Sequence, residues 1–109
     1  MENHQIEKSK VQKLEDAIGY MDNSTVSRQI IKIPSGNITL FAFDEGEGLS
    51  VHSAPFDAFI QIIDGSVEIT IGGVKHNLIS GDFIIMPANI PHALKATKKF
   101  KMLLVMIKS

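Results

Sequence analysis

The chain has 109 residues, with 11 basic and 12 acidic side chains and no cysteine. The absence of cysteine excludes disulfides, thiolate metal sites and a cysteine nucleophile, and a formal charge of −1 gives no basic footprint for nucleic acid. No apolar run reaches the length of a membrane span, and the polar first ten residues lack the apolar core of a secretory signal. We therefore expect one cytoplasmic domain with no nucleic-acid or membrane partner.

Residues 1–24 are expected to form a tail and a short helix ahead of the main domain. Ser9 and Gln12 have the spacing of a capping box at a helix N-terminus. Val11, Leu14 and Ile18 then follow at intervals of three and four residues, which is the spacing of one helix face. The sequence therefore predicts a short helix that lies across the main domain or across a partner.

Residues 25–109 are predicted to form an all-β domain. Short runs rich in Ile, Val, Phe and Thr are separated by Gly-, Pro- and Asp-containing breakers such as Asp64-Gly65, and Gly72-Gly73 is a two-residue hairpin signal. Many short strands at such spacing are typical of a sandwich or barrel. The expected strands are Val26–Ile33, Ile38–Phe43, Phe56–Ile63, Val67–Ile71, Lys75–Leu78, Phe83–Met86, His92–Ala96 and Lys101–Ile107.

Several of these strands are apolar at both odd and even positions, notably Phe59–Ile63, Phe83–Met86 and Met102–Ile107. A strand with one face in water should alternate between apolar and polar residues, so both faces are expected to be covered. We expect a homodimer in which a second copy covers the outer face. The alternative is that the N-terminal helix covers this face within one chain.

Two segments resemble the paired motifs of the cupin superfamily, which read Gly-X5-His-X-His-X3–4-Glu-X6-Gly and Gly-X5-Pro followed by His. The matching residues are Gly46, His52, Gly65, Gly81, Pro87 and His92. The resemblance covers most of the chain, from about Gly36 to Ile107. It implies a double-stranded β-helix, the jelly-roll barrel of small cupins, with two antiparallel sheets.

The resemblance also implies where a metal would bind. Metal-binding cupins use two His and one Glu of the first motif and the His of the second, which correspond here to His52, Ala54, Ala58 and His92. Two imidazoles alone form a weak site, so we expect no tightly bound cofactor; a weakly bound divalent transition metal at the two His is the alternative. Asp57 lies on the opposite strand parity from Ala58 and would supply a carboxylate only through a local bulge.

His52 and His92 are the candidate catalytic residues, because both are expected to face the barrel cavity. There they would hydrogen-bond a ligand or transfer protons near neutral pH; alternatively, they are cavity-wall residues bonded to backbone or water. The expected ligand pocket consists of His52, Ala54, Ala58, Gln61, Met86 and His92. An alternative role for Gln61 is a hydrogen bond to backbone or across a dimer seam. His76 is expected on the surface, and His4 lies in the tail.

Three functions are compatible with these residues. The first is a metal-free cupin that binds an unidentified small molecule in its barrel or acts as a dimeric sensor or accessory protein. The second is an enzyme of the isomerase, epimerase or dioxygenase type, which would use His52 and His92 for acid–base chemistry or weak metal binding. The third is a structural oligomer with a filled barrel. The missing donors favour the first, non-enzymatic function.

Overall fold

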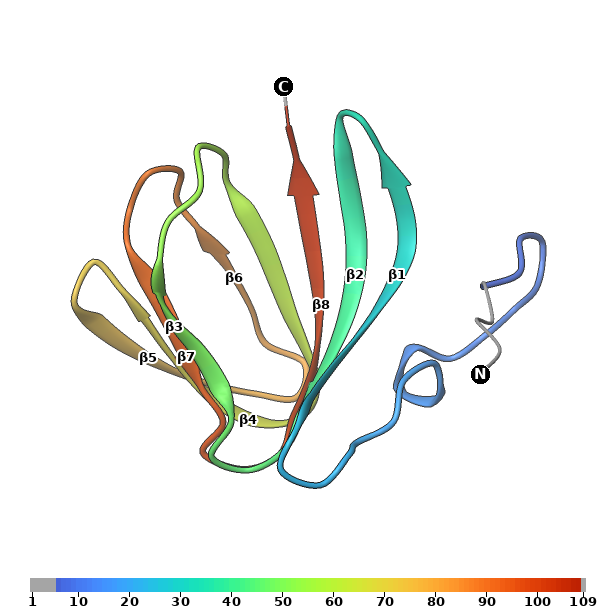
Figure 1. Cartoon of the computed structure of the whole chain (residues 1–109), viewed down its shortest axis with the longest axis horizontal. Helices are drawn as coiled ribbons and strands as arrows, with labels where there is room; N and C mark the ends of the chain where they lie inside the picture. The colour runs from blue at the N-terminus through green and yellow to red at the C-terminus, as the bar shows by residue number, and fades with distance from the viewer. Residues whose placement is uncertain (1–5, 109) are drawn as a thin grey trace.

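A computed structural model describes residues 6–108, and within them the chain forms eight β-strands and one 3-10 turn (Figure 1). The elements are η1 Leu14–Asp16, β1 Thr25–Ile33, β2 Gly36–Phe43, β3 Gly48–His52, β4 Ala58–Ile71, β5 Val74–Ile79, β6 Phe83–Met86, β7 His92–Lys95 and β8 Phe100–Ile107. The predicted all-β fold is confirmed. In residues 6–108 no helix is long and apolar enough to cross a membrane.

The strands form two antiparallel sheets that share β4. Sheet A has the order β1-β2-β8-β4-β6, and sheet B has the order β3-β7-β4-β5. The first half of β4 pairs with β6 and β8, whereas its second half pairs with β5 and β7. In Figure 1, β3, β5 and β7 lie on the left and β1, β2 and β8 on the right, so the long strand β4 joins the two walls of the barrel.

Asp64-Gly65, which we expected to separate two strands, instead bends one continuous strand. The pairing of β4 with β8 shifts register between Ile62 and Asp64, and Gly65 has φ +80°. A Cβ atom at residue 65 would lie 1.9 Å from the carbonyl oxygen of Lys99, so the bend requires glycine. The prediction of two strands was wrong because a left-handed glycine turns the chain here without ending its hydrogen bonding.

The main core lies between the two sheets. At its centre the rings of Phe43 and Phe100 stack with centroids 4.6 Å apart, and neither ring is exposed. The buried members of this interior cluster are Phe43, Ala58, Ile60, Ile62, Val67, Ile69, Leu78, Met86, Leu94, Ala96, Phe100 and Met102. Alternate residues of β4 supply much of it, as the two-residue period of a strand requires.

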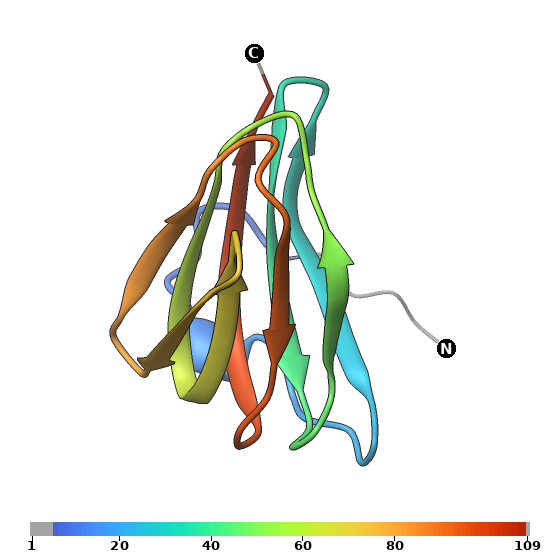
Figure 2. The same cartoon turned by 90° about the vertical axis from the view of Figure 1, so that its left-hand side faces the viewer.

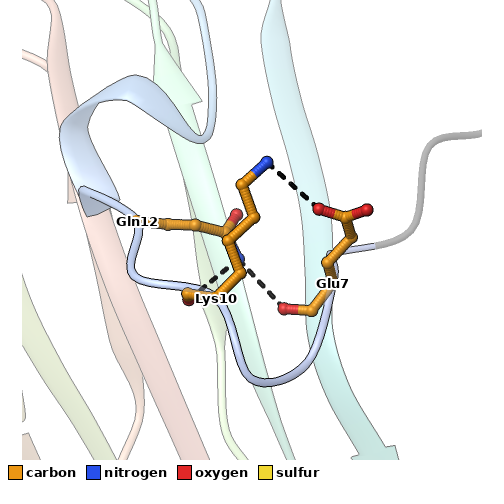
Figure 3. A network of polar contacts seen from close by, with 3 residues as sticks. All are labelled: Glu7, Lys10 and Gln12. Carbon is orange, nitrogen blue, oxygen red and sulfur yellow. Dashed lines mark hydrogen bonds and ion pairs between the residues drawn. The ribbon is translucent and has the colours of Figure 1, made fainter.

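The predicted N-terminal helix is present only as the single 3-10 turn η1, and the capping box is not formed. Ser9 has a left-handed backbone, with φ 60°. The amide of Gln12 donates to the carbonyl oxygens of Glu7 and Lys10, at 3.0 and 3.5 Å, and Lys10 pairs with Glu7 (Figure 3). Val11, expected on the buried face, is 99% exposed. The Gln12 side chain, predicted to take part in a capping box, therefore stabilises a loop.

The N-terminal segment nevertheless covers part of the outer face of sheet A, and Figure 2 shows it behind that sheet when the molecule is viewed from sheet B. Ile18 is buried against Leu40 and Ala42. The Tyr20 hydroxyl donates to Asp64 at 2.6 Å, and burial together with this carboxylate raises the pKa of the phenol. The N-terminal segment therefore covers this part of the sheet, although not as the helix that the alternative expected.

Candidate functional site

The structure brings His52 and His92 together at one end of the barrel. His52 ends β3, His92 begins β7, and the two are register partners. Their Nε2 atoms lie 3.1 Å apart, and the ring planes meet at 73°. His92 is 4% exposed, whereas His52 is exposed to solvent. The His92 imidazole is therefore buried, and the His52 imidazole beside it is exposed to water.

Two backbone carbonyl groups orient the imidazole rings. Nδ1 of His52 donates to the carbonyl oxygen of Ser50 at 2.8 Å, and Nδ1 of His92 donates to that of Ile90 at 3.2 Å. Because a carbonyl oxygen has no proton to give, both Nδ1 atoms carry hydrogen. In the neutral state each Nε2 then presents a lone pair to the other.

Two lone pairs that face each other repel, and a single additional proton removes this repulsion. Two facing lone pairs 3.1 Å apart become an N–H···N hydrogen bond when one Nε2 is protonated, and the pair then carries one positive charge. Burial, followed by the neighbouring His52, lowers the pKa of His92, while the hydrogen bond to Ile90 opposes the shift. Burial of His92 therefore disfavours the charged form of that ring.

Two chain connections frame this end of the barrel. One links His52 to Ala58 and the other links Met86 to His92, so each crosses from one sheet to the other. Sequence reasoning missed the contact that joins them, in which the amide of Asn89 donates to the carbonyl oxygen of Ala54 at 2.7 Å. Asn89 has φ 64°, a conformation that asparagine tolerates better than most residues; its place between two prolines was the available signal.

The two alanines leave the site short of metal donors. Ala58 is 4% exposed and pairs with Met86 and Met106, so its surroundings are apolar. Among residues 6–108, no three His, Cys, Asp or Glu side chains lie close enough together to hold a metal ion. The donor set therefore does not fit the four-ligand metal centre that the motifs imply, and no metal-dependent step follows from it.

Asp57 does not take the place of the missing carboxylate. The pairing of Ala58 with Met86 and Met106 is regular at this end of β4, so no bulge turns Asp57 inward. Its carboxylate instead accepts the amide hydrogen of Ala88 at 2.8 Å. It borders a groove of about 500 Å³ on the outside of sheet A.

Two sequence-based placements need correction. Gln61 pairs with Phe83 and Leu103 and has the opposite parity to the buried Ile60 and Ile62, so it lies on the outer face of sheet A and not in the barrel interior. His76, expected on the surface, is partly buried. The Gly72-Gly73 hairpin pairs it with the fully buried Ile69, and paired residues share a sheet face. His4 lies outside the described residues.

Comparison with known proteins gives a consistent result. Residues 39–108 match the family model described as the cupin domain. A conserved protein of unknown function from Streptococcus pyogenes has a structure with a TM-score of 0.92 and 38% sequence identity, covering 97% of this chain and 93% of that one. A cupin superfamily protein from Desulfitobacterium hafniense has a TM-score of 0.91 and 25% identity, with full coverage of both chains.

One curated relative has a named activity. The quercetin 2,3-dioxygenase of Bacillus subtilis is 36% identical over 58 residues. That match covers 51% of this chain and 17% of the relative, so the chain spans about a sixth of the relative's length.

Proposed function

The chain belongs to the cupin family, and from that premise we propose that its barrel binds a small, largely apolar acid through the His52–His92 pair, without a tightly held metal. The observation that supports the proposal most is the fixed orientation of the two rings, with both Nδ1 atoms bonded to backbone and the two Nε2 atoms 3.1 Å from each other. A ligand would therefore bind at the Nε2 side, in place of the bond between the two rings.

Charge favours an anionic ligand. The singly protonated pair is a cation, and the hydrogen bonds of the two rings go to backbone carbonyls and to each other. Within residues 6–108 no cluster places a carboxylate beside the pair. A partly buried charge without a counter-ion attracts an anion. The rest of the environment is apolar, since Ile71 is the register partner of His92 and packs on the interior cluster.

Benzoate and benzamide are suitable probes, because they have nearly the same shape and differ in charge. We expect benzoate to shift the imidazole signals of His52 and His92 in NMR titrations near neutral pH, and benzamide to bind at least tenfold more weakly. His52→Ala and His92→Gln should each abolish the benzoate response, whereas the control His76→Gln should keep it. Equal binding of the two probes, or unchanged binding by both site variants, would contradict the proposal.

The similarity to a dioxygenase favours a second candidate, an enzyme. An oxygenase of that kind would require metal donors beyond the two imidazoles, whereas an isomerase or epimerase would require only proton transfer at Nε2. Titration with Fe²⁺, Mn²⁺, Ni²⁺ and Zn²⁺ by calorimetry tests the oxygenase. Stoichiometric binding at micromolar or tighter affinity, lost in His92→Gln, would favour it over the metal-free binding protein.

A further inference from the structure

Near the β1–β2 turn, strand β2 directs polar side chains into the barrel. Phe43 belongs to the interior cluster and Phe41 packs against it, and the pairing of β2 with β8 is regular along the whole strand. Alternate residues of a strand share a face, so Asn37 and Thr39 point to the same interior, and Thr39 is only 8% exposed. Ile38, between them, points outward. At this end β2 is therefore polar inside and apolar outside, the reverse of the usual alternation.

On the β8 side, the inner wall next to these two polar side chains is apolar. Their register partners are Met106 and Leu104, which pack on the interior cluster, and Met106 pairs in turn with the buried Ala58. Asn37 and Thr39 therefore mark the position at which the inner wall of sheet A changes from apolar to polar.

Asn37 lies at the same end of the barrel as the two imidazoles. The register row from Asn37 through Met106 ends at Ala58, which follows the connection from His52. In Figure 1 this connection and the β1–β2 turn lie at the upper end of the molecule. In Figure 2, β3 and β7, the strands of His52 and His92, stand in front of β2 and β8. The polar side chains of β2 and the imidazole pair therefore belong to opposite walls of one end of the barrel.

A hydrogen bond between the two polar side chains sets what they offer to a ligand. The Thr39 hydroxyl donates to Oδ1 of Asn37 at 3.3 Å, so the amide presents its NH₂ group and the hydroxyl oxygen keeps its lone pairs. Within residues 6–108 the Nδ2 hydrogens of Asn37 have no acceptor. No buried side-chain nitrogen in this part of the chain lacks a partner, so Nδ2 of Asn37 is accessible to solvent and to a ligand.

We propose that Asn37 and Thr39 recognise a hydroxyl group on the acid bound by the His52–His92 pair, which makes the preferred ligand a hydroxy acid with an apolar body. This inference rests on the proposed function. A ligand hydroxyl accepts from Nδ2 of Asn37 and donates to the oxygen of Thr39, whereas a second carboxylate would face that oxygen without a hydrogen to donate. Facing sheets lie about 10 Å apart, a separation that a single ring with a group at each end can bridge between side chains.

The test compares hydroxybenzoates with methylbenzoates, which have nearly the same shape but lack the hydroxyl. In NMR titrations of the full chain, 3- or 4-hydroxybenzoate should bind about fivefold or more tightly than the matching methylbenzoate, since a neutral hydrogen bond contributes about twofold to tenfold in affinity. The preferred hydroxybenzoate should also shift the side-chain amide signal of Asn37. Asn37→Leu and Thr39→Val should each bring the ratio of the two dissociation constants close to one. The matched control Asn77→Leu, at an exposed asparagine of β5 that pairs with Glu68, should keep the wild-type ratio.

Circular dichroism shows whether each variant is folded, and Thr39→Val provides the test if Asn37→Leu does not fold. Benzoate binding without a preference for either hydroxybenzoate would overturn this inference and leave the proposed function intact. Failure of benzoate and of both hydroxybenzoates to bind would overturn both. Tighter binding of terephthalate than of either hydroxybenzoate would also overturn the inference, because the exposed Lys32, the register partner of Asn37 on β1, would then select a second carboxylate.

Discussion

Restoring the two missing donors tests the donor count on which the proposed metal-free site depends. The double substitution Ala54→His and Ala58→Glu recreates the four-ligand set with His52 and His92. Ala58 is 4% exposed among apolar neighbours, so without metal the new carboxylate is a buried charge with no partner. Such a charge costs about 3–5 kcal/mol, and we expect the metal-free variant to be destabilised by that amount.

A divalent metal supplies the missing countercharge in this variant. At a concentration about a hundredfold above Kd, a ligand stabilises the folded state by about 2.7 kcal/mol. For a domain of this size, about 1 kcal/mol changes Tm by about 4–8 °C, so Zn²⁺ or Mn²⁺ should raise the Tm of the variant by roughly 10–20 °C.

The assay is thermal unfolding followed by circular dichroism, with metal and with a chelator. The matched control is Ala54→His with Ala58→Gln, which has almost the same shape as the Glu variant without its charge. Both the control and the wild type should show at most a small metal-dependent rise in Tm. A wild type whose Tm rises with metal as much as that of the Glu variant would refute the reasoning, because two imidazoles would then suffice.

Two further predictions concern stability. The pKa of His92 is lowered from 6.5 in the folded state, so the unfolded chain takes up a proton on this imidazole at a higher pH than the folded chain does. The contribution of the neutral His92 to the free energy of unfolding is therefore fully present above about pH 6.5 and is lost as pH falls toward the lowered folded pKa. In urea unfolding across this pH range, His92→Gln should lose less unfolding free energy on acidification than the wild type does. An unchanged dependence of unfolding free energy on pH would show that His92 is not the group responsible. Gly65→Ala, with φ +80° and a backbone clash, should lose more than about 3 kcal/mol. Gly46→Ala, with φ +85° and open space, should lose only about 1–2 kcal/mol, and equal losses in urea unfolding would show that the clash is not the cause.

Sequence patterns predicted the strands that are rich in apolar residues. The two wrong predictions, the missing strand β3 and the N-terminal helix, have a common cause. β3 was not predicted because Leu49 alone of its residues packs on the interior cluster, while its other four residues are exposed. It is a strand because β7 pairs with it, which is a tertiary contact that local propensity does not encode. The N-terminal spacing failed for a related reason, since only Ile18 of the three apolar positions is buried.

Part of the candidate site was predictable from the single sequence. The motifs identified the two His that lie together, and the same motif match placed alanines at the other two ligand positions. The side of Gln61 was also predictable, because residues three apart on a strand face opposite ways. The hairpin register likewise fixed the face of His76. The two carbonyl bonds that set both imidazole tautomers were not predictable, since they depend on how residues 50 and 90 turn next to each ring.

Those carbonyl bonds also explain how a site that lacks metal donors can stay organised. In metal centres the ion and the second-shell acceptors together hold the imidazoles in place, and the acceptors fix tautomer and ring orientation. Here the β3–β7 register fixes the two backbones, and Ser50 and Ile90 fix the rings. An incoming ligand therefore meets groups whose rotamers are already restricted, and it loses little affinity to their ordering. His52→Asn should reveal this, because it shortens the polar side chain while the Ser50 carbonyl remains: we expect weaker benzoate binding with unchanged unfolding free energy, and a matching loss of stability would mean that the pair serves the fold rather than a ligand.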